Sequence, residues 1–150
     1  MSKVVAVKML IQDLNALERA CTRLGLELVR GQQTYRWYGD RGQKEGVPEG
    51  FHRDELGHCE HAIRIPNNTT AYEIGVVTRR DGQAGYTLLW DSWNKGCGMT
   101  DYVGEDCATL SQMYTREVAL DQFAQLNHYM IEEQQGENGD IILTFAAQGA

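Results

Sequence analysis

The chain has 150 residues, of which 42% are hydrophobic and only two are proline, and this size and composition are typical of one soluble globular domain. Its 14 basic and 21 acidic residues give a formal net charge of −7, and no run of Lys and Arg is present, which disfavours direct nucleic-acid binding. No apolar run approaches the roughly 20 residues that a membrane-spanning helix needs.

The first elements expected along the chain are a strand and a helix. Apolar residues alternate over Val5–Ile11, as in a strand with one buried face. Asp13 then caps a helix that begins at Leu14, has apolar residues at spacings of three and four, and ends at Gly25. The opening MSKVVAVKMLIQDLN has no small-residue cleavage site, so we interpret it as this strand and not as a signal peptide.

The four cysteines form no CxxC pair. Without a secretory signal we expect a cytoplasmic protein with reduced thiols and no disulfide framework. The excess of acidic residues has two possible interpretations. The negative charge keeps the protein soluble, or it forms an acidic face that imitates nucleic acid or binds a basic protein.

A hairpin and a long loop are expected next. Residues 26–30 and 34–38 have strand character and are joined across Gly31. Residues 39–58 have the sequence GDRGQKEGVPEGFHRDELGH, which is polar and contains five glycines. Structureless loops of about twenty residues are usually functional or disordered. We therefore expect a mobile loop. It is either an insertion without a role or a recognition element that orders when a partner binds, and we favour the second.

The second half of the chain predicts a three-stranded meander, a helix and a hairpin. The strands of the meander are expected at 59–65, 72–78 and 86–91. A glycine-rich break leads to a helix at about 107–126, and the last hairpin follows with strands at 128–133 and 140–145.

These elements predict an α+β fold in a single domain over residues 1–150, with one antiparallel sheet of about eight strands covered by two helices. The segments RLGLELVRGQQTYRWY and QLNHYMIEEQQGENGDIILTF both run from a helix end through a strand and a polar turn into another strand. This internal similarity indicates two β-α-β-β units, although chance similarity of two amphipathic units explains it equally well.

Several short motifs lie along the chain. They are a Y-x-I/V-G strand at 72–75, a W-D pair at 90–91, a Gln-x-Tyr helix at 112–114 and a closing D-I-I-L strand. With these motifs the chain resembles, over nearly its whole length, the hypothetical chloroplast reading frame thirty-five family, or domain of unknown function twelve fifty-seven. Small members of that family are encoded by plastids, cyanobacteria and some phages. The family has no established reaction, so the resemblance implies no catalytic residues, and the loop at 39–58 departs from its pattern.

A metal site is one hypothesis for the stretch HRDELGHCEHAIRI. Its candidate ligands are His52, His58, Cys59 and His61. A structural zinc site usually has two close ligand pairs, which this spacing does not supply. In a strand that begins near Cys59, this thiol and His61 would instead start the same buried row as Ile63. The simpler interpretation is therefore a buried thiol and a half-buried imidazole at a sheet edge.

Acid–base chemistry is a second hypothesis, with Glu117 and Asp121 as the candidate catalytic residues. They lie one turn apart on the second predicted helix, beside its apolar residues. Carboxylates there are either salt-bridged at the margin of the apolar stripe or line a cleft. The glycines match neither the phosphate-binding P-loop nor the dinucleotide fingerprint, so no cofactor is expected.

The aromatic residues indicate a binding surface. Trp37 and Tyr38 lie with Arg41 in one segment, and Trp93 lies beside Asp91 in another. Trp, Tyr and Arg dominate the energetics of many interfaces, so these five residues are the candidate partner-binding set. The alternative is that the aromatic side chains fill the core of a twisted sheet.

Two functions from different classes remain. The first is a protein-interaction or regulatory module, of phage origin in one interpretation, which binds a host or operon-encoded protein such as an ATPase or a nucleic-acid enzyme. The alternative is a small enzyme or metal-binding protein that uses the carboxylates of the second helix with His61 and His128. No recognisable catalytic spacing is present, which favours the module. The sequence leaves the oligomeric state open.

Overall fold

The computed structural model describes residues 4–38, 47–136 and 139–148. The helices are α1 (Leu14–Arg23), α2 (Thr100–Val103) and α3 (Ala108–Gln125), with short 3₁₀ segments η1 (Arg53–Glu55), η2 (Trp93–Gly98) and η3 (Glu105–Cys107). The strands are β1 (Val5–Ile11), β2 (Glu27–Arg30), β3 (His61–Arg64), β4 (Ile74–Thr78), β5 (Tyr86–Trp90), β6 (His128–Gln135) and β7 (Ile141–Ala147).

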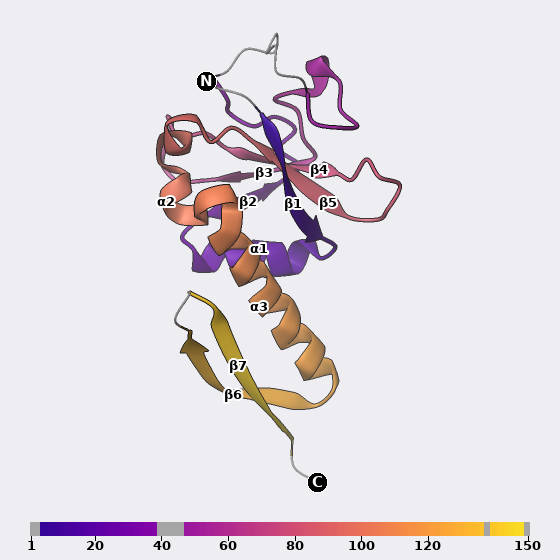
Figure 1. Ribbon diagram of the computed structural model, residues 1–150, viewed down its shortest axis with the longest axis vertical. Coiled ribbons are helices and arrows are strands. Elements are labelled where there is room, and N and C mark those ends of the chain that lie inside the picture. Colours follow the sequence, from indigo (N-terminus) through magenta and orange to yellow (C-terminus); the bar gives the residue numbers. More distant parts are fainter. Residues whose placement is uncertain (1–3, 39–46, 137–138, 149–150) are drawn as a thin grey trace.

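The strands form two antiparallel sheets. The larger has five strands in the order β1-β5-β4-β3-β2, extended by an isolated bridge between Thr34 and His58. The smaller is the β6–β7 hairpin. Figure 1 shows the large sheet and the hairpin at opposite ends of the molecule, with α3 running between them. The α+β class is thus confirmed, whereas the single sheet of about eight strands is wrong.

Two layers of side chains cover the two faces of the large sheet. On one face, α1, α2 and α3 contribute to a core around Leu17, Ile63 and Leu88. On the other face, Tyr35 and Leu56 pack with strand residues that alternate with those of the first core. The second half of the loop at 39–58 therefore packs against the sheet, since Leu56 is fully buried. Its first half, 39–46, lies outside the described residues.

The first helix begins and ends as the sequence predicts. The Asp13 carboxylate accepts hydrogen bonds from the main-chain N–H groups of Asn15 and Ala16, at 2.9 and 3.1 Å. After the last turn, Gly25 has φ +80°, a left-handed conformation that glycine adopts without strain. The hydroxyl of Tyr114 on α3 also accepts from the N–H of Gln12, at 3.0 Å, which ties α3 to this corner.

The predicted hairpin of residues 26–30 and 34–38 is wrong. Strand β2 pairs with β3, and Glu27 lies opposite Arg64 with its carboxylate 3.2 Å from the guanidinium. The chain turns away at Gly31, whose N–H donates to Nδ1 of His61. Residues 34–38 then run beside the sheet, where Thr34 makes an isolated bridge to His58.

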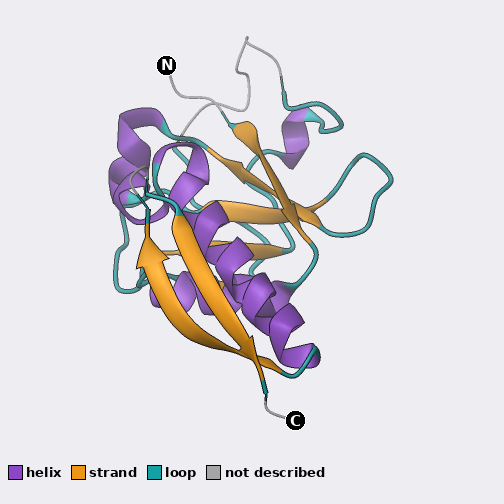
Figure 2. Ribbon diagram, turned by 60° about the horizontal axis from the view of Figure 1, so that its bottom comes forward, coloured by secondary structure: helices purple, strands orange, loops and turns teal. Residues whose placement is uncertain are grey.

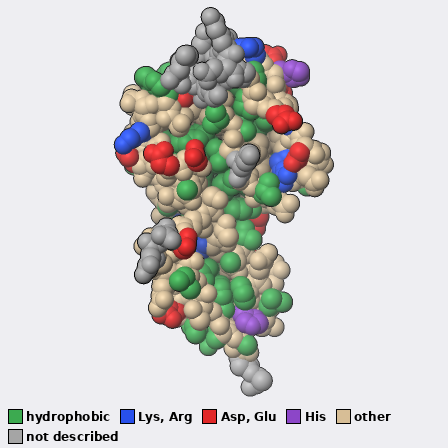
Figure 3. Space-filling view, viewed as in Figure 1, with side chains coloured by type: hydrophobic (Ala, Val, Ile, Leu, Met, Phe, Trp, Pro, Cys, Tyr) green, Lys and Arg blue, Asp and Glu red, His purple; other side chains and the backbone are tan. Residues whose placement is uncertain are grey.

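The C-terminal hairpin is separate from the large sheet because α3 carries the chain away from it. Eighteen helical residues extend about 27 Å. Ile141 and Leu143, which a single sheet that included residues 140–145 would place in the main core, are only half-buried and line a groove beside α3. The second predicted β-α-β-β unit therefore does not join the sheet of the first. Figure 2 shows the hairpin lying along α3, and Figure 3 shows hydrophobic side chains gathered over this part of the molecule.

Candidate functional site

The carboxylate of Asp91 joins two tryptophans that lie far apart in the sequence. Asp91 directly follows β5 and is only 2% exposed. Its Oδ2 atom accepts a hydrogen bond from Nε1 of Trp37 at 2.8 Å, and its Oδ1 atom accepts from the main-chain N–H of Trp93 at 2.8 Å. A buried carboxylate is stable when such donors saturate it. Asp91 thus fixes both tryptophans at one end of the sheet.

Trp93 is exposed at the start of an unusual turn. Its side chain is 49% exposed, and the next four residues, Asn94 to Cys97, all have positive φ, between 50° and 61°. Each non-glycine residue in this region costs about 1–2 kcal/mol. The turn is held from inside because the carbonyl of Gly96 accepts a hydrogen bond from the N–H of Tyr72, at 3.0 Å. Backbone strain of this kind concentrates at functional sites.

The segment that contains Trp37 is anchored by a buried glutamate. Glu73, 6% exposed, accepts from the main-chain N–H of Arg36 at 2.7 Å, and its own N–H donates to the Arg36 carbonyl at 2.9 Å. Tyr38 follows, 59% exposed, with its ring centroid 5.3 Å from that of Tyr72. We call Trp37, Tyr38 and Trp93 the aromatic surface. Of the predicted partner-binding set, Arg41 lies outside the described residues.

Sequence reasoning missed Glu73 and Gly75, which position this surface. A Cβ atom at Gly75 would lie 2.5 Å from the Tyr35 ring, so only glycine leaves room for that ring. A signal was present in AYEIGVV, where a single carboxylate interrupts an apolar run and so predicts a buried partner. Its partners are the main-chain N–H of Arg36, the amide of Gln32 and the Arg36 guanidinium, which periodicity does not identify.

The four candidate metal ligands have separate roles. Within residues 4–38, 47–136 and 139–148, no three His, Cys, Asp or Glu side chains are grouped to hold a metal ion. The N–H of His52 donates to Glu55 in η1, and His58 bridges to Thr34. Nδ1 of His61 accepts from Gly31 at 3.0 Å. Cys59 precedes β3 and packs against the second core, whereas Ile63 belongs to the first core, so the predicted common row is wrong. Burial raises the pKa of the Cys59 thiol to about 12.

Glu117 lies at the centre of an ion cluster between α1, α3 and β6. It is 2% exposed, and its Oε1 atom lies 3.1 Å from the Arg19 guanidinium. Its Oε2 atom lies 2.9 Å from Arg23 and 2.6 Å from Arg116. Arg19 also pairs with Asp121. Both candidate carboxylates are therefore salt-bridged, which is the first of the two arrangements that the sequence left open.

The other candidate groups of the enzyme hypothesis do not converge on these carboxylates. His61 lies on β3, where its ring packs edge-on against Tyr86. His128 lies on β6 in the other sheet, with its ring 5.7 Å from that of Phe123. The two imidazoles thus belong to different sheets and different aromatic contacts.

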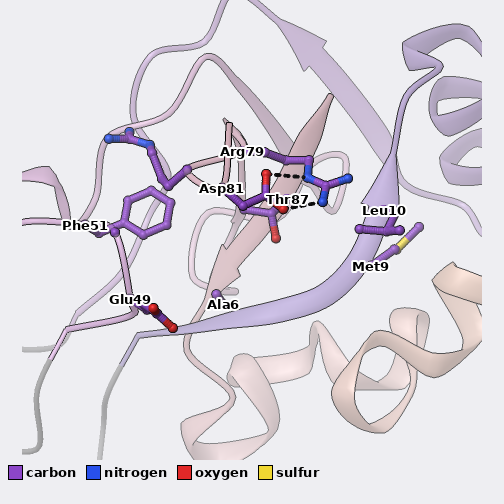
Figure 4. A pocket seen from close by; sticks show the side chains of 10 residues that line it. Ala6, Met9, Leu10, Glu49, Phe51, Arg79, Asp81 and Thr87 are labelled. Atoms are coloured by element: carbon purple, nitrogen blue, oxygen red, sulfur yellow. Dashed lines mark hydrogen bonds and ion pairs between the residues drawn. The ribbon is translucent and has the colours of Figure 1, made fainter. Parts of the chain in front are cut away.

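A cleft of about 870 Å³ opens beside β1. Figure 4 shows Met9 and Leu10 at one end and Glu49 and Phe51 at the other. The guanidinium of Arg79 between them is bound to Asp81 and lowers the pKa of that carboxyl. The neighbouring Arg80 lies 4.4 Å from the Phe51 ring centroid and pairs with Glu55. The arginines that border the cleft thus already have carboxylate partners.

Among the described helices, none is long and apolar enough to cross a membrane. Comparison with known proteins gives no match to this chain among family models, curated proteins or solved structures. Membership of the chloroplast reading frame family therefore stays a prediction. The candidate site is therefore chosen from the geometry of the molecule. At the aromatic surface around Asp91, exposed apolar side chains lie beside a buried carboxylate and a strained turn.

Proposed function

We propose that the chain is a protein-interaction module that binds a partner protein through the aromatic surface. The observation that carries this proposal is the pair of hydrogen bonds from Trp37 and from the Trp93 main chain to the buried carboxylate of Asp91. A core-filling role does not require Trp93 at 49% exposure or Tyr38 at 59%. Partly exposed tryptophan and tyrosine are the side chains that most often dominate binding energy.

Anchoring the surface favours binding for an entropic reason. Immobilising a free side chain at an interface costs about 0.5–1.5 kcal/mol. Asp91 already holds the indole of Trp37 and the main chain of Trp93 in the unbound protein, and Glu73 holds the main chain at Arg36. The conformational entropy of this surface is therefore lost when the protein folds, and binding a partner costs less entropy.

The role that fits this module is regulatory. If the gene belongs to a phage or an operon, the partner is a host or operon-encoded protein such as an ATPase or a nucleic-acid enzyme. The formal net charge of −7 supports a basic partner face, because charge complementarity increases the rate of encounter. The resemblance to the chloroplast reading frame family is compatible with this role, and we retain that membership as part of the proposal.

The alternative, a small enzyme built on Glu117 and Asp121, has less support. A general base needs a carboxylate oxygen that is available to take a proton from a substrate. Both oxygens of Glu117 face guanidinium groups, at 2.6 to 3.1 Å. These contacts assign Glu117 to the packing of α1 against α3.

The test is quantitative capture from a lysate of the source cell, or of its host, with matched variants. Trp93→Ala removes an aromatic side chain from the surface, and Tyr129→Ala removes one of nearly equal exposure, 50%, from β6. We expect the wild type and Tyr129→Ala to retain the same abundant protein and Trp93→Ala to lose it at least about tenfold, as for a hot-spot residue. Equal retention by both variants would remove the aromatic surface from the account.

A further inference from the structure

Strand β7 has one edge paired with β6 and one edge open. Within the described part of the chain, β6 is its only strand neighbour. Its sequence IILTFAA has no charge and no proline. Long, apolar, uncharged edge strands are templates for pairing with another chain, and proteins usually protect them. Two-stranded hairpins are also only marginally stable by themselves.

The hydrogen bonds at both ends of the hairpin show which main-chain groups face outward. The N–H of Gly136 donates to the carbonyl of Asp140, and the N–H of Gln148 donates to the carbonyl of Asn127. Main-chain direction alternates along an antiparallel strand. The groups of four residues of β7 therefore point away from β6: Ile141, Leu143, Phe145 and Ala147.

An apolar groove runs along this same edge. Its volume is about 510 Å³, and it lies between α3 and the inner face of β7, lined among others by Ala119, Phe123, Leu143 and Phe145. The rings of Phe123 and Phe145 stack at 3.9 Å between centroids. No residue of β6 lines the groove, so a strand added to the edge of β7 would place its side chains there.

We propose that this edge binds a second copy of the chain, with β7 pairing antiparallel to β7 about a two-fold axis at Thr144. In this register Ile141 faces Ala147 of the second copy, and Leu143 faces Phe145 of the second copy. All four outward-facing residues thereby gain partners, giving about eight main-chain hydrogen bonds. Phe145 of the second copy enters the groove beside Leu143. The two hairpins become one four-stranded sheet.

The distribution of charged residues over the hairpin favours the edge of β7 and a second copy of that strand. Strand β6 carries Glu132 and Glu133, so pairing β6 with β6 would bring like charges together, whereas β7 brings none. A copy of β7 offers an equally uncharged strand and the same alternation. Strand pairing alone buries little surface, so we expect a weak, concentration-dependent dimer.

The first test is sedimentation velocity from low micromolar to millimolar protein. Ala147→Pro removes an outward N–H at the last residue of β7, and Gln135→Pro makes the same change at the last residue of β6. We expect the wild type to dimerise, Ala147→Pro to weaken dimerisation at least about tenfold through two lost hydrogen bonds, and Gln135→Pro to leave it unchanged. A wild type that stays monomeric, or equal effects of the two prolines, would overturn the proposal.

Cross-linking tests the register without depending on the stability of a proline variant. Residues on the axis form a non-hydrogen-bonded pair with Cα atoms about 4.5 Å apart, which suits a disulfide. Mild oxidation should link Thr144→Cys into dimers, and should not link Glu132→Cys, whose residue lies opposite Thr144 on β6. The unsubstituted protein controls for Cys59 and Cys97, which are both partly exposed. Preferential linking through Cys at 132 would contradict the proposal.

Failure of these tests would leave the aromatic surface unaffected, because that surface adjoins β5 in the large sheet. The two proposals rest on different observations. Conversely, Trp93→Ala is expected to leave the dimer unchanged, so that the two proposals fail separately.

Discussion

Glu117 shows how a side chain that looks catalytic in the sequence acts in packing. Three guanidinium groups surround its carboxylate, and Arg116 also reaches Glu133 on β6 at 2.6 Å. The cluster therefore joins α1, α3 and the C-terminal hairpin through one buried charge. A buried charge is tolerated when partners of opposite sign surround it, as here, and removing one member of such a cluster leaves the others uncompensated.

Removing this charge should destabilise the protein strongly. Glu117→Gln leaves Arg116, itself 7% exposed, without its buried partner, and we expect a loss of about 3 kcal/mol in the free energy of unfolding. Asp121→Asn is the matched control. Its side chain is 44% exposed, so its loss should stay below about 1 kcal/mol. Urea unfolding measures both, and similar values for the two variants would contradict the central role of Glu117.

Gly75 is a second residue whose role is steric. A Cβ atom there would lie 2.5 Å from the ring of Tyr35, so Gly75→Ala must displace that ring. Overpacking of this kind costs about 1–3 kcal/mol. At Gly136 the nearest atom would lie 3.5 Å away, an ordinary contact, and Gly136→Ala should change stability by about 0.5 kcal/mol or less. Thermal or urea unfolding of the two variants separates these outcomes.

At the scale of elements, what could be predicted from the sequence follows how local each signal is. Helix α1 was correctly bounded because its cap at Asp13 and its end at Gly25 are neighbours in sequence. The hairpin through Gly31 was wrong because β2 finds its partner in β3, about thirty residues later. Pairing over such a distance depends on tertiary contacts, which periodicity does not contain.

The site was predictable in part. The aromatic composition grouped Trp37, Asp91 and Trp93, which the structure joins through the Asp91 carboxylate. The left-handed turn after Trp93 was not foreseen, because three of its four residues are not glycine. The Gln-x-Tyr motif also has a structural role. Gln112 donates to the carbonyl of Gly139 at 2.6 Å and Tyr114 accepts from Gln12, so α3 ties the hairpin to the main core.

The contact between α3 and β6 should weaken in acid. Glu133 accepts two hydrogen bonds from the Arg116 guanidinium, at 2.6 and 2.7 Å, and these lower the pKa of Glu133 below its ordinary value of 4.5. A lowered folded-state pKa stabilises the protein above about pH 4.5, and this contribution is lost as the pH falls through the folded-state pKa.

We therefore expect the urea midpoint of the wild type to fall more steeply below pH 4.5 than that of Glu133→Gln. The variant has no carboxyl group to titrate at this position, so the difference between the two curves isolates the pair. Parallel curves for the two proteins would show that the titration of Glu133 does not contribute to the pH dependence of stability.

At the scale of the whole molecule, the two proposed surfaces are set apart. The aromatic surface adjoins the large sheet, whereas the open edge of β7 belongs to the hairpin that lies along α3 at the opposite end of the molecule, as Figure 1 shows. A dimer through β7 would carry two aromatic surfaces. Two linked binding sites raise the apparent affinity for a partner that is itself oligomeric.

The measurement that tests the proposed function most directly is photo-cross-linking in the source cell or its host. A photoreactive phenylalanine replaces Trp93 in one variant and Leu126, 65% exposed at the end of α3, in the other. The account predicts one abundant adduct with a partner protein from position 93 and none of that mass from position 126. An identical set of adducts from both positions, or no adduct from position 93, would contradict a binding role for the aromatic surface.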